Sequence, residues 1–263
     1  VCSSDLTPRG EPDPPRARAA PVSALGPDTV EIAASVMCAD YRRLGEQIRA
    51  LDAAGIDRFH LDVMDGSFVP NLGLGPELVA ALRSETGKPF DAHLQVADPD
   101  RFVDAFADAG CETLVVHLEA THHHRRLAAR IRARGCTPGI AINPVTPPDA
   151  LEYLYDEVGQ VVVMSVDAGF AGQPFTPAVL PKMAAIHERI AAHGSAARIA
   201  ADGNVNGRTI DRLVTSGARI LVLGSTGLFN QPDFAAAVAA ARAQATAALA
   251  ASRGRSEEPS ELQ

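Results

Sequence analysis

Short apolar and β-branched runs alternate with longer segments of helical periodicity between Val30 and about residue 250. Runs of the first kind are typical of strands buried on both faces, and apolar residues that recur every three or four positions are typical of amphipathic helices. Strands are predicted from this pattern at residues 30–36, 58–64, 89–94, 113–118, 138–143, 160–166, 198–202 and 219–224.

The segments between these strands predict helices at residues 41–54, 99–109, 125–134, 177–192 and 206–216. Asp40 precedes the first of them and is a typical N-cap residue. Glycines also stand where helices return to strands, a position that often requires a left-handed backbone. These glycines are Gly55, Gly87, Gly110, Gly135 and Gly217.

Alternating strands and helices specify a parallel sheet, which is either open and doubly wound or closed into a barrel. The pattern holds eight such units, and no GxGxxG motif follows the first strand. Both observations favour the closed form. We therefore predict an α/β fold with a single (β/α)8 TIM barrel.

The barrel domain is expected at residues 29–250. Residues 1–28 are rich in proline and charge and lack periodicity, and the first and last few residues resemble translated adapter sequence. We expect residues 1–28 and 251–263 to be disordered or artefactual extensions.

Composition excludes several classes of function. The net charge is -8 without a basic stripe, which argues against nucleic-acid binding. The four cysteines show neither CxxC spacing nor the density of a disulfide scaffold, and no uninterrupted apolar stretch approaches about 18 residues. We expect a cytoplasmic protein without nucleic-acid or membrane partners, and leave open whether it forms a homo-oligomer.

Ligand-type side chains gather on the predicted strands. His60 and Asp62 share one face of the second strand, His93 lies on the third, and Asp202 ends the seventh. In a barrel these four groups could converge on one divalent ion, and the mixed N/O set suits Zn, Fe(II), Mn or Co. The alternative is that the aspartates cap strand ends and the histidines are hydrogen-bonded core residues.

Such a site suggests proton abstraction beside a carbonyl. A bound metal would stabilise an enediolate, and one carboxylate on each face of it could remove or return a proton. That chemistry is epimerisation. His117 and Glu119, at the end of the fourth strand, also have the spacing of ligands, but we interpret them as a supporting or structural pair.

Glycine-bearing loops after the sixth, seventh and eighth strands are candidates for binding phosphate, because glycine lets backbone N–H groups approach an anion closely. Ordinary turns are the alternative for each loop. Ser35, Met64 and Met164 would line the same cavity. The candidate loop residues are Gly169, Phe170, Ala171, Gly172, Gly203, Asn204, Gly224 and Ser225.

Four segments resemble the signature blocks of the ribulose-phosphate 3-epimerase family. They are HLDVMDGSFVPN at 60–71, DAHL at 91–94, MSVDAGFAGQ at 164–173 and DG at 202–203. The resemblance implies a TIM barrel and a place in the pentose phosphate pathway. It also implies a metal held by His60, Asp62, His93 and Asp202.

The same resemblance implies that Asp62 and Asp202 are the acid/base pair. It further implies that Ser35 touches substrate and that residues 169–172, Gly203 and residues 224–225 hold the phosphate. The family usually has proline where Ala168 stands, glycine where Asn204 stands and methionine where Gln95 stands. Residues 35–38, 170–175 and 227–230 look rather like the allulose-6-phosphate 3-epimerase branch.

We expect a metal-dependent isomerase that interconverts D-ribulose 5-phosphate and D-xylulose 5-phosphate through a 2,3-enediolate. The first alternative is a D-allulose 6-phosphate 3-epimerase that gives D-fructose 6-phosphate. A metal-assisted phosphosugar decarboxylase or aldolase is a further alternative, and a Schiff-base aldolase is a weak one, because no lysine lies on a predicted strand. The non-enzymatic alternative is a barrel that only binds a phosphosugar.

Overall fold

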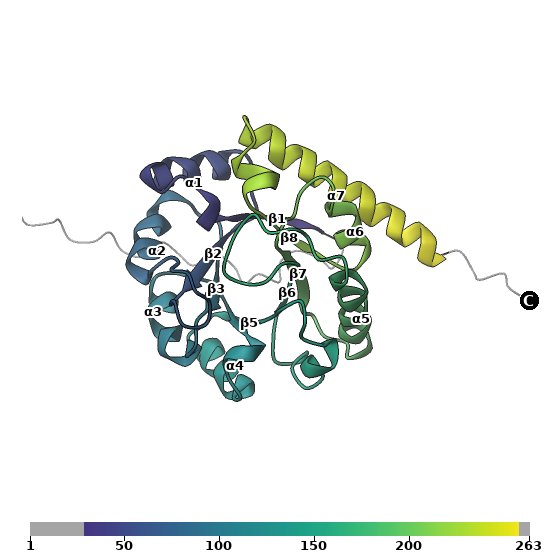
Figure 1. The fold of residues 1–263 in the computed structure, drawn as a ribbon, viewed down its shortest axis with the longest axis horizontal. Helices are drawn as coiled ribbons and strands as arrows, with labels where there is room; N and C mark the ends of the chain where they lie inside the picture. The colour runs from purple at the N-terminus through teal and green to yellow at the C-terminus, as the bar shows by residue number, and fades with distance from the viewer. Residues whose placement is uncertain (1–28, 258–263) are drawn as a thin grey trace, which may run out of the picture.

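The computed structural model describes residues 29–257, and both the extension 1–28 and residues 258–263 lie outside the described part of the chain. Eight parallel strands close into a barrel in sequence order, with β8 paired to β1, and helices surround it (Figure 1). The predicted TIM barrel is confirmed. Its strands are β1 (Glu31–Ser35), β2 (Arg58–Met64), β3 (Phe90–Gln95), β4 (Thr113–His117), β5 (Thr137–Ile142), β6 (Gln160–Met164), β7 (Arg198–Asp202) and β8 (Ile220–Leu223).

The helices alternate with the strands along the sequence, and in space they surround the outside of the barrel (Figure 1). The α-helices are α1 (Leu44–Ala53), α2 (Pro76–Leu82), α3 (Val103–Asp108), α4 (His124–Ala133), α5 (Val179–Ala192), α6 (Ile210–Thr215) and α7 (Phe234–Glu257). The 3-10 helices are Val36–Cys38, Tyr41–Arg43, Arg83–Glu85, Pro99–Phe102, Leu118–Ala120 and Pro148–Leu151, and Ser225–Phe229 forms a π-helix.

Two hydrophobic layers follow from the alternation along the strands. Outward residues such as Phe59, Leu61 and Val63 of β2 pack in the layer between barrel and helices. The inward layer is smaller, and its residues are Ala33, Val115, Ala141, Val162, Met164, Ala200, Ile220 and Val222. Because both faces are buried, the strand sequences are nearly continuous apolar runs, and polar residues inside the barrel therefore stand out.

A polar network fills the barrel beneath the candidate site. The buried Arg58 donates from Nε to Glu31 Oε2 at 2.6 Å and from Nη1 to Gln160 Oε1 at 2.9 Å. Gln160 Nε2 in turn donates to Asp91 Oδ2 at 2.6 Å. Charges buried this deeply are tolerated only when they are paired, so this network fixes the side chain of Asp91 within the barrel.

Several local predictions differ from the structure at element ends. Asp40 accepts from the backbone N of Arg42 as predicted for an N-cap, but it opens a 3-10 turn, Tyr41–Arg43, before α1 begins. Of the five glycines predicted to be left-handed, all except Gly87 have a positive φ. First turns of helices are often 3-10, which explains the later starts of α1 and α3, preceded by the 3-10 helices Tyr41–Arg43 and Pro99–Phe102.

Helix α7 continues to Glu257, past residue 250, where we expected the domain to end. Its segment Phe234–Arg253 is long and apolar enough to cross a membrane by length and composition. One such helix is weak evidence, and here Ala241, Ala245 and Leu249 pack into the outer core. Arg242 also donates to Asp57 Oδ2 at 2.8 Å. We therefore describe α7 as the last outer helix of the barrel, which extends beyond its edge (Figure 1).

Candidate active site

Two imidazoles and two carboxylates meet inside the carboxyl end of the barrel. His60 and Asp62 come from β2, His93 from β3 and Asp202 from β7, and one ligand atom from each lies within 4.8 Å of all the others. His60 Nε2 lies 3.2 Å from His93 Nδ1 and 3.7 Å from Asp62 Oδ1. Asp202 Oδ2 lies 3.6 Å from both His60 Nε2 and His93 Nδ1.

Strand register produces this convergence. In the β2–β3 pair Asp62 lies opposite His93, and in the β6–β7 pair Met164 lies opposite Asp202. Side chains two apart on a strand share a face, so His60 and Asp62 both project inward. The sequence pattern therefore predicts the inward direction, and closure of the barrel brings the strands together.

The four atoms fit a single divalent ion. Ligand atoms about 2.0–2.2 Å from a tetrahedral centre lie about 3.3–3.6 Å from one another. Five of the six pairs in the cluster are separated by 3.2 to 3.7 Å, and all four ligand atoms lie within 4.8 Å of one another. The cluster could therefore hold a metal ion, and its mixed nitrogen and oxygen donors suit several first-row metals equally.

Electrostatics of the cluster favour a cation at its centre. Burial opposes a positive charge on His60, but Asp62 and Asp91 outweigh it and hold the pKa of His60 well above its usual value. Burial raises the pKa of Asp202, but hydrogen bonds from His60 and His93 outweigh it and lower that pKa. Within residues 29–257 both cluster carboxylates pair with imidazoles rather than with lysine or arginine.

Asp62 is also held by two neighbours. Its Oδ2 accepts from Ser35 Oγ at 3.0 Å, and its Oδ1 accepts from Gln95 Nε2 at 2.9 Å. Gln95 is buried, and its own Oε1 has no hydrogen-bond partner. Gln95 stands where the resemblance noted above would give methionine, and in the structure it contacts the carboxylate itself.

Each cluster imidazole has a partner for its second ring nitrogen. His60 Nδ1 lies 3.4 Å from Asp91 Oδ2, and His93 Nε2 lies 2.9 Å from His117 Nε2. His117 Nδ1 lies 3.0 Å from Glu119 Oε2. Asp91 was absent from the predicted site residues, although its spacing from His93 places it on the same inward face.

Burial lowers the pKa of His117 to about 4, so this ring is neutral near pH 7. Burial raises the pKa of Glu119, but hydrogen bonds from His117 and Thr146 outweigh it and lower that pKa to about 2. Glu119 is therefore ionised beside a neutral imidazole.

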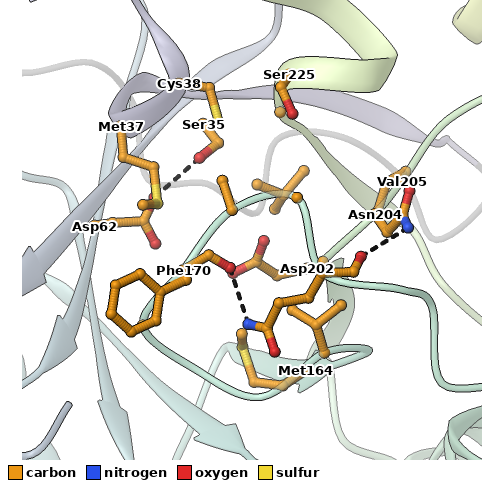
Figure 2. Close-up of a pocket in the computed structure, with 18 of the residues that line it drawn as sticks. Ser35, Met37, Cys38, Asp62, Met164, Phe170, Asp202, Asn204, Val205 and Ser225 are labelled. Carbon is orange, nitrogen blue, oxygen red and sulfur yellow. Dashed lines mark hydrogen bonds between the residues drawn. The ribbon is translucent and has the colours of Figure 1, made fainter. Parts of the chain in front are cut away.

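A pocket opens directly above the cluster, with a volume of about 630 Å³ including its open mouth. This size is typical of small-molecule sites. Figure 2 shows Asp62 and Asp202 directed into it from different strands, with Ser35 facing Asp62. The predicted substrate-binding residues all line it, and these are Ser35, Met64, Met164, Gly169, Phe170, Ala171, Gly172, Gly203, Asn204, Gly224 and Ser225.

Other residues also line the pocket. Asp167, Gln173 and Thr226 lie in the glycine-bearing loops singled out as phosphate candidates, whereas sequence reasoning missed Met37, Cys38, Val166, Val205 and Val222. These five lie within three residues of the carboxyl end of a barrel strand, and that position was the available signal. His60 and His93 are fully buried beneath the pocket floor.

The loops after β6 and β7 are fitted closely together. Gly203 has φ +111°, and an added Cβ would lie 2.9 Å from the backbone N of Val166. The next residue, Asn204, has φ +50°, and its Nδ2 donates to Gln173 O at 2.8 Å (Figure 2). Asparagine tolerates this conformation better than most residues with a side chain, which accounts for its place after a glycine.

Comparison with known proteins identifies the family. Residues 31–229 match the model of the ribulose-phosphate 3 epimerase family. The ribulose-phosphate 3-epimerase of Synechocystis is 41% identical over 215 residues, which cover 81% of this chain and 93% of that protein. The chain belongs to the ribulose-phosphate 3-epimerase family. Its fold, its membership of this family and its class as an isomerase, all predicted from the sequence, are confirmed.

Other members of the ribulose-phosphate 3-epimerase family are similarly close. The Bacillus subtilis ribulose-phosphate 3-epimerase is 39% identical over 205 residues, covering 78% of this chain and 94% of that protein. The chloroplastic ribulose-5-phosphate-3-epimerase of Arabidopsis thaliana is 37% identical over 219 residues, covering 82% of this chain and 78% of that protein. The described barrel thus spans most of the length of these relatives.

Two solved structures with low sequence identity show the same fold. A 3-hexulose-6-phosphate synthase superimposes with a TM-score of 0.58 at 15% identity, over 83% of this chain and 99% of that one. A structure named KGPDC, from Streptococcus mutans, superimposes with a TM-score of 0.60 at 14% identity, over 86% and 98%. At such low sequence identities the structural similarity supports the barrel fold and carries no information on function.

Proposed function

We propose that the chain is a metal-dependent ribulose-phosphate 3-epimerase that interconverts D-ribulose 5-phosphate and D-xylulose 5-phosphate. The observation that carries the proposal is the placement of Asp62 and Asp202. These carboxylates come from strands that are not neighbours in the barrel, and both face one pocket above a four-residue cluster. Epimerisation requires a base and an acid on opposite faces of one carbon, and two separated carboxylates meet that requirement.

His60, Asp62, His93 and Asp202 would hold one divalent ion, with Zn, Fe(II), Mn and Co as the candidates. When bound, the ion would supply positive charge close to where negative charge develops on the substrate's oxygens. The chain itself supplies an enclosed setting for that charge, because His60 and His93 are fully buried and Asp62 is 2% exposed.

The two aspartates would move the proton. One carboxylate takes the C3 proton from one face of the ketose, which leaves a 2,3-enediolate, and the other returns a proton to the opposite face. Ser35 Oγ donates to Asp62 Oδ2 at 3.0 Å, so it can hold that oxygen toward the pocket. Met64 and Met164, which are 6% and 3% exposed, line the pocket and would keep water away from the enediolate.

Three loops would hold the phosphate. Residues 169–172, Gly203 with Asn204, and Gly224 with Ser225 line the same pocket as the carboxylates. Loops after the last strands of a TIM barrel commonly bind phosphate. The expected partner is therefore a small phosphorylated ketose. The expected cytoplasmic location and the expected absence of nucleic-acid and membrane partners stay predictions, and whether the protein forms a homo-oligomer stays open.

The relatives reported above are named for ribulose phosphate, so they do not favour the allulose 6-phosphate alternative. A barrel that only binds a phosphosugar is not favoured either, because both carboxylates are present and face the pocket. Side-by-side turnover of ribulose 5-phosphate and allulose 6-phosphate by the metal-loaded protein tests the proposal. We expect a higher kcat/KM for ribulose 5-phosphate. If the protein turns over neither sugar, the proposal is contradicted. If it prefers allulose 6-phosphate, the proposed substrate changes to the hexulose phosphate.

A further inference from the structure

The ring of His93 is hydrogen-bonded on both sides, and its two nitrogens face different partners. Nδ1 faces the carboxylate cluster, 3.7 Å from Asp62 Oδ1. Nε2 lies 2.9 Å from His117 Nε2, and the two rings stack with centroids 4.9 Å apart and planes inclined by 17°. His117 Nδ1 continues the chain to Glu119 Oε2 at 3.0 Å. Both histidines are fully buried, so water cannot replace these partners.

The direction of both hydrogen bonds in the series Glu119–His117–His93 follows from the charge of Glu119. An ionised carboxylate can only accept, so Nδ1 of His117 must carry a proton. A fully buried imidazole resists a second proton, so Nε2 of His117 is left with a lone pair and accepts. The proton between the two rings therefore belongs to His93 Nε2. A neutral His93 then has its free lone pair on Nδ1, toward the cluster.

Glu119 is itself held in place from the loop after β5. Its Oε1 accepts from the backbone N of Asn143 at 2.9 Å and from Thr146 Oγ1. The other oxygen is thereby directed to His117. Phe68 closes the opposite side of the His117 ring, with centroids 4.8 Å apart. The acceptor at the end of the chain is thus fixed by two donors from a neighbouring loop.

We propose that Glu119 and His117 are positioning residues that set the tautomer of His93 and keep its Nδ1 lone pair available to a divalent ion. The inference rests on the proposed metal site, and it assigns a role to a pair that carries neither the metal nor the substrate. Hydrogen-bond partners behind a ligand typically change metal affinity by about 10–100-fold when they are altered.

The substitution Glu119→Gln offers a sharp test, because the loop decides how the new amide is oriented. The backbone N–H of Asn143 requires an acceptor, so the amide oxygen stays on that side and the amide NH2 faces His117. His117 must then accept on Nδ1 and carry its proton on Nε2. The hydrogen bond between His117 and His93 therefore reverses its direction, and Nδ1 of a neutral His93 becomes protonated.

The first measurement is the tautomer of His117 in the metal-free protein, read from the ring ¹⁵N and ¹H correlations by NMR. We expect the proton on Nδ1 in the wild type and on Nε2 in Glu119→Gln. The second measurement is the dissociation constant of Zn²⁺ or Mn²⁺ by competition with a chelator, and we expect about 10–100-fold weaker binding in Glu119→Gln.

Two controls separate positioning from general disruption. Glu152 lies beside His193 in an exposed pair with Oε1 3.3 Å from Nε2, so Glu152→Gln changes a similar pair away from the site and should leave metal affinity unchanged. Thr146→Val removes one donor to Glu119 but keeps the carboxylate. It should preserve the His117 tautomer and weaken metal binding less than Glu119→Gln, and it remains informative if Glu119→Gln fails to fold.

Three results would overturn the inference. A wild-type His117 with its proton on Nε2 would show that the hydrogen bonds run the other way. A reversed tautomer in Glu119→Gln with unchanged metal affinity would show that the tautomer does not matter to the site. A wild type with the expected tautomer but no metal binding would contradict the metal site as well, and the NMR result would distinguish that case from the first.

Discussion

Asp62 contacts both cluster imidazoles and two further polar side chains. One of its oxygens faces both imidazoles and accepts from Gln95, and the other accepts from Ser35. A carboxylate whose two oxygens have different partners can contribute to a metal site with one and face substrate with the other. We propose these two roles for the two oxygens of Asp62. Loss of Asp62 should therefore be more damaging than loss of a residue that is a metal ligand alone.

Removing one imidazole should empty the metal site. We expect about one divalent ion per wild-type chain and a large loss in His93→Ala, because the three remaining groups would leave one position to water. Elemental analysis of purified protein measures this directly. The exposed His122→Ala variant is the control and should keep its metal, since His122 lies outside the cluster. Full metal content in His93→Ala would exclude His93 as a required ligand.

Removing either carboxylate should stop net epimerisation. Asp62→Asn and Asp202→Asn should each lower kcat by at least about 10²–10⁴-fold, the typical contribution of a general acid or base. One variant should still exchange the C3 proton with solvent deuterium, which NMR of the sugar detects, because the opposite carboxylate remains. Asp211→Asn on α6 is the control. Epimerisation near the wild-type rate in either site variant would rule out the two-carboxylate mechanism.

At the scale of elements, the loops after the strands set the shape of the pocket, and the loop after β7 packs closely against the residues that follow β6. Gly203 is left-handed and packed against Val166, while Asn204 joins its loop to Gln173 in the loop after β6. These two residues have different tasks: Gly203 allows a close backbone approach, and Asn204 joins the two loops and lines the pocket. Each task can be tested separately.

Adding one methyl group at Gly203 should destabilise the loop. Gly203→Ala places a side chain at φ +111° and a Cβ 2.9 Å from the backbone N of Val166, and such strain costs about 1–3 kcal/mol. Thermal unfolding should show a lower Tm, and steady-state kinetics should show a raised KM. Gly207→Ala is a matched control four residues later, where the nearest atom would be Gln244 Oε1 at 3.6 Å. Equal Tm values for the two variants would contradict the strain argument.

We expect Asn204 and Gln95 to influence the choice of sugar. Both are polar groups in the pocket lining, and a pocket that satisfies a hydroxyl discriminates better than one that distinguishes a bare methylene. We expect the protein to accept both pentulose and hexulose phosphates, with a preference that narrows or reverses in Asn204→Gly. The measurement is the ratio of kcat/KM for ribulose 5-phosphate and allulose 6-phosphate in the same metal. If Asn204→Gly and Gln95→Met both leave this ratio unchanged, these two residues do not select the sugar. The loops at 170–175 and 227–230 then become the next candidates for sugar selection.

At the scale of the whole molecule, the barrel brings together side chains from distant parts of the chain. The cluster joins β2, β3 and β7, so it exists only when the barrel is closed. Binding an ion at such a site favours the folded state, because the unfolded chain offers no equivalent arrangement.

Metal should therefore stabilise the fold measurably. At a free ion concentration of about 100 times Kd the gain is about 2.7 kcal/mol, which for a domain of this size raises Tm by about 5–10 °C. Differential scanning calorimetry of chelator-treated protein with and without added ion measures the shift. His93→Ala should show little shift under the same conditions. A wild-type Tm that is insensitive to both chelator and added ion would contradict a resident metal site.

The sequence by itself determined the barrel, its strands and the inward direction of the ligand-type residues. Periodicity is local, so it can be read without knowing what a strand pairs with, and β2 and β7 have their predicted ends. The pocket-lining residues were predictable for a related reason. In a closed parallel barrel, residues that end or follow a strand collect at one end, whichever strand they belong to.

Only the tertiary structure decided which side chains touch. Gln95 lies 33 residues from Asp62, and His117 lies 24 residues from His93, so these contacts depend on register and on ring orientation between strands. Local patterns carry no information on either. For the same reason the sequence left His117 and Glu119 without a definite role, and it did not predict that helix α7 continues past residue 250 to Glu257. The roles of His117 and Glu119 depend on packing, because a polar group buried in a barrel must find its hydrogen-bond partner on another strand or loop.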